Sequence, residues 1–97
     1  MMGRMPEIRD NASESQYEIY VDGQLAGFLT YKLREGTFVA IHTEIDDAYE
    51  GQGLGSQLVK QVLADLRDAG LLLKPSCPFV KSYIERHPEY ADLIEAA

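Results

Sequence analysis

The chain has little of what secreted and membrane proteins depend on. Among its 97 residues there is a single cysteine, Cys77, so no disulfide can form within the chain, which favours a reducing, cytoplasmic setting. No apolar run approaches the roughly 18 residues of a membrane span. Residues 1–10 lack the apolar core of a signal peptide. We therefore expect neither secretion nor a membrane partner.

Basic residues are also few. Nine Lys and Arg against 16 Asp and Glu give a formal net charge of -7. Nucleic acids are held by basic patches, so this balance argues against a nucleic-acid partner. An acidic surface attracts cations and suits an amine as the acceptor of a transferred group, although the charge can equally serve solubility alone.

The rest of the composition is that of one small globular domain. Apolar residues make up 45% of the chain, which is too many for a disordered protein. Residues 1–15 are polar, and we expect them to form a flexible segment with a short strand around Ile8. Residues 16–97 are expected to form the single folded domain.

Alternating apolar residues, tight turns and one long helical repeat predict the elements of this domain. The expected elements are strands at 17–21, 25–33, 37–45 and 71–73, and helices at 54–69 and 78–87. Asp22-Gly23 is typical of a tight hairpin turn, so the sheet should begin antiparallel. The last strand returns after a helix, as in a crossover unit, and the fold class is therefore α/β (α+β).

The segment EGQGLGS, residues 50–56, leads into the long helix. Its glycines leave the first N–H groups of the helix, which have no partner inside it, open to a phosphate or pyrophosphate. A P-loop would carry a lysine here, and a dinucleotide loop would space its third glycine one residue later. The spacing fits the acyl-CoA loop of GNAT acyltransferases, except that Glu50 replaces the usual Gln or Arg. A loop that only caps the helix is the remaining alternative.

The third predicted strand carries titratable side chains close to this loop. Strict alternation puts Phe38, Ala40, His42 and Glu44 on one face of the sheet, and assigns the opposite face to the core. His42 and Glu44 are then candidates for acid–base chemistry, with a solvated sheet edge as the alternative. Cys77 is expected at the N-cap of the last helix, beside Pro78 at the first helical position.

Several short blocks carry a family resemblance. They are Val21-Asp22-Gly23, Ala26-Gly27-Phe28, Tyr31, His42-Thr43-Glu44, Gly51-Gln52-Gly53-Leu54-Gly55, Pro75-Ser76-Cys77-Pro78-Phe79-Val80 and Arg86-His87-Pro88-Glu89-Tyr90. On these blocks the chain resembles the GNAT superfamily, and within it the smallest single-domain subgroup. The resemblance implies a minimal GNAT fold, a mixed and mostly antiparallel sheet with helices on both faces. It also implies acetyl-CoA as co-substrate and site residues that match His42 and Cys77.

The expected chemistry is acetyl transfer from CoA to an amine of unknown identity. The expected CoA contacts are Ile45, Gly51, Gln52, Gly53, Leu54, Gly55 and Ser56. Main-chain N–H groups near Glu44 and Ile45 would hold the thioester, and Glu44 or His42 would take the proton of the amine. Cys77 would return a proton to CoA, carry the acetyl group itself, or serve only as a small buried hydrophobe.

Two further expectations concern metals and the alternative function. The candidate side chains show no paired spacing of the kind that metal sites use, so we expect no metal. The alternative function is a non-catalytic acyl-CoA-binding module that acts through a protein partner, and the oligomeric state is left open.

Overall fold

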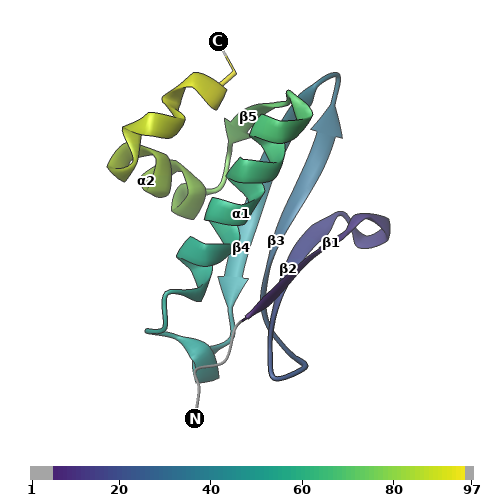
Figure 1. Ribbon diagram of the computed structural model, residues 1–97, viewed down its shortest axis with the longest axis vertical. Coiled ribbons are helices and arrows are strands. Elements are labelled where there is room, and N and C mark those ends of the chain that lie inside the picture. Colours follow the sequence, from purple (N-terminus) through teal and green to yellow (C-terminus); the bar gives the residue numbers. More distant parts are fainter. Residues whose placement is uncertain (1–5, 96–97) are drawn as a thin grey trace.

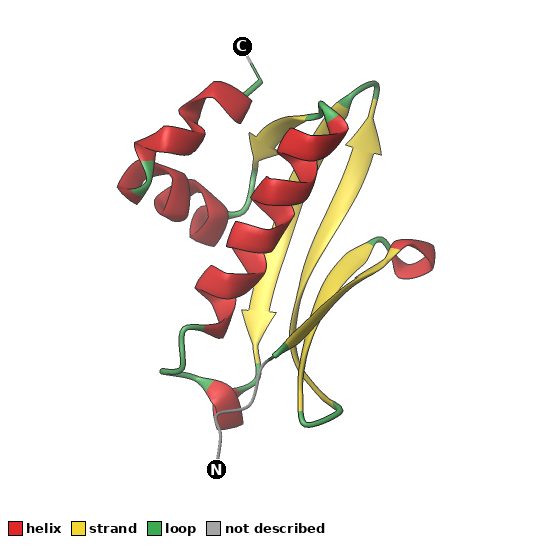
Figure 2. Cartoon of the chain, viewed as in Figure 1, coloured by secondary structure: helices red, strands yellow, loops and turns green. Residues whose placement is uncertain are grey.

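The computed structural model describes residues 6–95, which form a five-stranded sheet with helices packed on it. The strands are β1 Glu7–Asn11, β2 Gln16–Val21, β3 Gln24–Arg34, β4 Thr37–Ile45 and β5 Leu72–Pro75. The helices are α1 Leu54–Ala69 and α2 Pro78–Arg86, with 3-10 turns η1 Ala12–Glu14, η2 Asp47–Tyr49 and η3 Pro88–Leu93. Figure 1 shows α1 lying along the sheet with α2 beside it, and Figure 2 shows the same arrangement by element type.

The sheet has the predicted mixed and mostly antiparallel character. Its strands lie in the order β1-β2-β3-β4-β5; the first four are antiparallel neighbours, and β5 runs parallel to β4. The strand expected around Ile8 is β1, in which Ile8 pairs with Ile19 of β2. Part of the segment expected to be flexible is therefore a sheet strand, because Ile8 packs against the core. Residues 1–5 of that segment lie outside the described residues.

The hydrophobic core lies between the sheet and the helices, on one face of the sheet. The predicted apolar stripe of α1 is buried, and one cluster joins it to Ile19, Leu29 and Phe38 of the sheet and to Val80 of α2. The opposite face of the sheet displays Leu25, Ile41 and Leu72, each more than 40% exposed. The expectation of helices on both faces is therefore corrected: within residues 6–95, α1 and α2 pack on the same face.

A β-bulge divides β4 and changes which side chains face the core. Thr30 of β3 pairs with His42, but the next residue, Tyr31, pairs with Ala40, so Ile41 is an extra residue without a cross-strand partner. Alternation restarts after the bulge, so the core side of β4 changes from even to odd residue numbers. Its members are Phe38 and Ala40 before the bulge and Thr43 and Ile45 after it.

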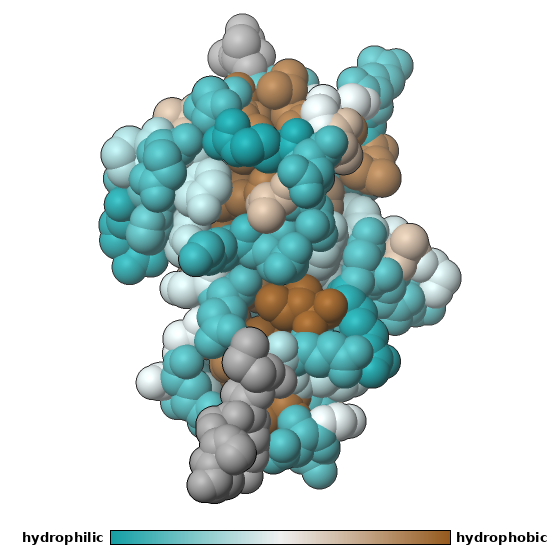
Figure 3. Space-filling view, in the orientation of Figure 1, coloured by the Kyte–Doolittle hydropathy of each residue, from teal (hydrophilic) through white to brown (hydrophobic). Residues whose placement is uncertain are grey.

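The outward side of the helices is polar. Figure 3 shows a largely hydrophilic surface over this face, with apolar residues visible only in separate spots. None of the helices within residues 6–95 combines the length and the apolar character needed to cross a membrane.

Candidate functional site

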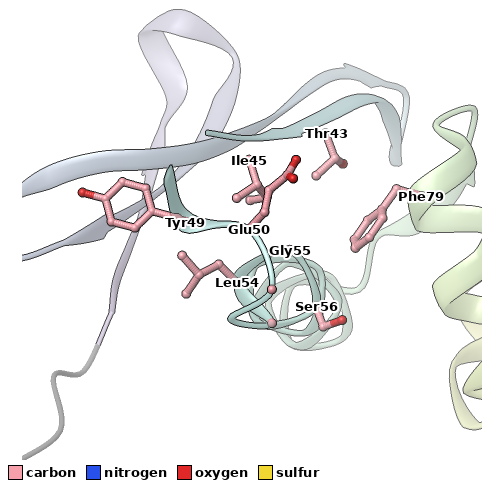
Figure 4. A pocket seen from close by; sticks show the side chains of 10 residues that line it. Thr43, Ile45, Tyr49, Glu50, Leu54, Gly55, Ser56 and Phe79 are labelled. Carbon is pink, nitrogen blue, oxygen red and sulfur yellow. The ribbon is translucent and has the colours of Figure 1, made fainter. Parts of the chain in front are cut away.

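A groove lies where the end of β4 meets the start of α1, at the lower end of the molecule in Figure 1. Its volume is about 450 Å³. The lining residues come from β4, the loop after it, α1 and α2: Thr43, Ile45, Tyr49, Glu50, Gly51, Gly53, Leu54, Gly55, Ser56 and Phe79. Figure 4 shows β4 above the groove, the head of α1 below it and Phe79 closing one side.

The head of α1 presents bare backbone to this groove. Gly53 is the N-cap residue, held at φ 73 with no side-chain cap, a conformation that favours glycine. The first hydrogen bond of the helix runs from the N–H of Gln57 to the carbonyl of Gly53, so the N–H groups of residues 54–56 precede the helical ladder. These donors, together with the helix dipole, form a site suited to a phosphate. Among the predicted contacts, Gln52 is exposed and does not line the groove.

Gly55 is required by a close contact across the groove. A Cβ atom at this position would lie 2.8 Å from the Cζ atom of Phe79 and 3.6 Å from Cγ1 of Ile45. The absence of a side chain lets the Phe79 ring of α2 approach the backbone of α1. The glycine therefore serves two purposes, since it opens the helix head and allows an aromatic wall beside it.

The free edge of β4 supplies a second set of backbone donors. β5 pairs with residues 37–40 of β4 and leaves residues 41–45 unpaired on that side. Just past β4, the N–H of Asp46 donates to the carbonyl of Ala26 in β3 at 2.8 Å. Because successive backbone groups of a strand point to alternate edges, the N–H groups of Thr43 and Ile45 point away from β3, toward the groove.

His42 and Glu44 lie on the other face of the sheet from the helix head. Both side chains point away from α1, as expected for the face opposite the core; the correction concerns Phe38 and Ala40, which the bulge at Ile41 separates from that face and which lie in the core. Their side chains are 57% and 62% exposed, and Nε2 of His42 lies 3.1 Å from Oε1 of Glu44. Glu44 lines an adjoining hollow of about 490 Å³, which shares Thr43, Ile45 and Glu50 with the groove.

Cys77 occupies the predicted N-cap of α2, behind the groove rather than in it. Its N–H donates to the carbonyl of Ala40 at 2.9 Å, which fixes the start of α2 against β4. The side chain is only 2% exposed, and Sγ donates a hydrogen bond to Oγ1 of Thr43 at 3.4 Å. The structure thus brings Cys77 close to the groove through Thr43, while His42 and Glu44 stand on the other side of the strand.

The electrostatics of the two hollows differ. The groove at the helix head contains Glu50 as its charged lining residue, whereas the adjoining hollow is lined by Glu44, Asp46, Asp47 and Glu50. Within residues 6–95 no group of three or more His, Cys, Asp or Glu side chains has a metal-binding arrangement. The helix head therefore suits an anion, and the adjoining hollow suits a cation.

The chain is similar to known proteins in sequence and in fold. Residues 16–93 match the family described as GCN5-related N-acetyl-transferase. The chain belongs to the GCN5-related N-acetyltransferase (GNAT) family. No curated protein matches the chain.

Solved GNAT structures have the same fold. A GCN5-like protein of Staphylococcus aureus has 27% identity and a TM-score of 0.72, over 94% of this chain and 89% of that chain. The Escherichia coli ribosomal-protein-S18-alanine N-acetyltransferase has 19% identity and a TM-score of 0.63, over 74% of this chain and 50% of its own. A GNAT family acetyltransferase of Brucella melitensis, in complex with acetyl-CoA, has 22% identity and a TM-score of 0.57, over 80% of this chain and 56% of that chain. These last two show the fold alone, and the chain spans about half the length of each.

Four lining residues of the groove were not among the predicted contacts: Thr43, Tyr49, Glu50 and Phe79. Thr43 was assigned to the core face, and it does lie on the helix side of β4, but β5 pairs only with residues 37–40 and this part of the strand therefore borders the groove. The sequence offered one indication of Phe79, its position at the start of a helix directly after Cys77 and Pro78, and in the structure the residue is exposed. Its approach to Gly55 depends on tertiary packing.

Proposed function

We propose that this GNAT domain transfers an acetyl group from acetyl-CoA to an amine. The observation that carries the proposal is that the bare head of α1 and the unpaired edge of β4 border one groove. The first element suits the pyrophosphate of CoA, and the second suits a thioester carbonyl. A pure CoA-binding module would have no need of the second feature or of the acidic hollow beside it.

The acceptor side of the reaction is assigned to the face that carries Glu44. A lysine-like amine has a pKa of about 10.4 and must lose a proton before it attacks a carbonyl. Glu44 lines the adjoining hollow together with Thr43 and Ile45, which supports the proposal that its carboxylate takes that proton directly or through a water. His42, 3.1 Å from the Glu44 carboxylate, holds that side chain in place and can pass the proton on to solvent.

The CoA side of the reaction is assigned to the opposite face of β4. The N–H groups of Thr43 and Ile45 would stabilise the oxyanion that forms when the amine attacks the carbonyl carbon. The departing sulfur would then need a proton, and Cys77 lies on this side of the strand, in contact with Thr43. Base and acid thus flank the free edge of β4 from its two faces, which favours direct transfer over an acetylated enzyme.

The proposal is tested by binding first and by turnover second. Titration calorimetry with acetyl-CoA should give saturable one-to-one binding, and dephospho-CoA and free pantetheine show how much of it the phosphates contribute. Thiol release from acetyl-CoA is then measured against a panel of primary amines: a polyamine, a peptide with an internal lysine and peptides with free N-termini. Binding without thiol release from any of them would favour the binding-module alternative. Absence of binding would overturn both.

A further inference from the structure

The thiol of Cys77 is separated from the groove by another side chain. Cys77 is 2% exposed and is not among the groove-lining residues, whereas Thr43 is. The described contact of Sγ in this direction is the hydrogen bond that it donates to Oγ1 of Thr43 at 3.4 Å. A thiol in this position cannot hand its proton straight to a sulfur atom that lies in the groove.

Thr43 is placed to bridge that gap. It stands on the unpaired half of β4, and its side chain borders both the groove and the adjoining acidic hollow. Figure 4 shows it beside Ile45 and facing the side that Phe79 closes. A hydroxyl has one proton to donate and two lone pairs to accept with. Because Oγ1 accepts from Cys77, its own proton stays available for an acceptor in the groove.

We propose that Thr43 is the catalytic residue that protonates the leaving sulfur of CoA, with Cys77 behind it as the proton source; this inference rests on the proposed acetyl transfer. As the bond between the carbonyl carbon and sulfur breaks, its electron pair stays on sulfur. The Oγ1–H bond of Thr43 breaks, and that proton forms the S–H bond of CoA. The same oxygen takes the proton of Sγ, which leaves Cys77 as a thiolate.

The relay resets without any further reactant. After CoA leaves, water in the groove gives a proton to Thr43 as Thr43 passes its own to Cys77, and the resulting hydroxide is neutralised by the amine proton that Glu44 releases. The same geometry argues against Cys77 as an acetyl carrier, because a nucleophilic sulfur has to touch the carbonyl carbon and Thr43 stands in its way.

The test needs no acceptor, because it compares CoA with desulfo-CoA, which lacks the sulfur. Both are titrated calorimetrically at pH 8.5, where an ordinary thiol is about half ionised. A hydrogen bond to a charged acceptor is stronger than a neutral one, so the wild-type chain should bind CoA about tenfold more tightly than desulfo-CoA. Thr43→Val should remove that preference by weakening CoA alone, and Thr43→Ser should restore it.

Thr37→Val is the matched control, since Thr37 is on the same strand and its hydroxyl bonds to Glu95 at 2.9 Å, far from the groove. It should keep the full preference for CoA, and circular dichroism establishes that each variant is folded. An unchanged preference in Thr43→Val, or a Thr43→Ser variant that behaves like Thr43→Val, would overturn the assignment of Thr43 alone. If neither ligand binds the wild-type chain, the proposed acetyl transfer itself fails.

Discussion

Residues 37–40 of β4 pair with β3 on one edge and with β5 on the other, whereas residues 41–45 pair with β3 only. The first half is buried throughout; the second is exposed or half-buried. A single extra residue, Ile41, separates the two halves and reverses which side chains face the helices. One strand thus contributes to the core at its start and to the site at its end.

The difference shows how so short a chain can hold a site. A domain of this size has one small core, and it cannot also enclose a separate cavity. Ending β5 at Pro75 exposes the backbone of β4 without removing any core residue. The donors along this edge are therefore backbone groups fixed by the sheet, which need no supporting side chains of their own.

The largest effect should be a loss of stability on substitution within residues 37–40, which pair on both edges. Phe38 is 2% exposed, stacks on Tyr31 with ring centroids 4.5 Å apart, and meets the edge of Tyr17. Phe38→Ala should lower the free energy of unfolding by about 3–5 kcal/mol, measured by urea denaturation, because it opens a cavity in the core. Affinity for acetyl-CoA, measured below the unfolding transition, should remain that of the wild type.

Ile41→Ala is the matched change in the bulge. Ile41 is 44% exposed, so the substitution should alter the free energy of unfolding by no more than about 0.5 kcal/mol. Comparable losses in the two variants would contradict the division of β4 into a core half and a site half. Because Phe38→Ala consumes much of the stability typical of a small domain, Phe38→Leu serves as a milder second variant.

Substitutions in residues 41–45 should change the reaction rate and leave the free energy of unfolding unchanged. Glu44→Gln should lower kcat by about 10²-fold or more with the amine that the acceptor panel selects, because it removes the proposed proton acceptor. Its affinity for acetyl-CoA should not change, since Glu44 lies on the face away from the helix head. His42→Ala should lower kcat about tenfold or less, because the side-chain pair is more than half exposed and its hydrogen bond is correspondingly weak.

Glu35→Gln provides the control for charge, since Glu35 is exposed in the turn between β3 and β4, at the far end of the sheet. It should leave kcat unchanged. A wild-type kcat in Glu44→Gln would remove Glu44 from the mechanism, and a larger loss in His42→Ala than in Glu44→Gln would transfer the role of base to His42.

The elements with regular periodicity were predictable from the sequence. The bounds of α1 and β4 agree with the expected ones, because each carries an uninterrupted apolar pattern between clear turn signals. The glycine loop was predictable as the entry to α1, since the positive φ of Gly53 is a local constraint, whereas the contact that requires Gly55 depends on how α2 packs. The family resemblance added the acetyl-CoA expectation, which neither periodicity nor charge contains.

The change of face within β4 was not predictable. A bulge leaves no mark on the pattern around Ile41, where the residues on both sides suit a strand equally well. Strict alternation therefore placed His42 on the same face as Phe38, and one unpaired residue reverses that result for everything after it. The contact between Sγ of Cys77 and Thr43 likewise depends on how α2 docks against β4, which no local rule specifies.

The smallest effect should come from Glu50, the charged lining residue of the groove. A carboxylate about 6 Å from a phosphate in water opposes binding by about 0.7 kcal/mol. Glu50→Gln should therefore tighten acetyl-CoA binding about threefold at low ionic strength, and the gain should largely disappear in 0.5 M salt because of screening. Asp68→Asn, an exposed change near the other end of α1, removes the same charge and should leave the affinity unchanged. Equal gains in the two variants would trace the effect to net charge and not to the groove. A weaker affinity in Glu50→Gln would instead mean that this carboxylate accepts a hydrogen bond from the ligand.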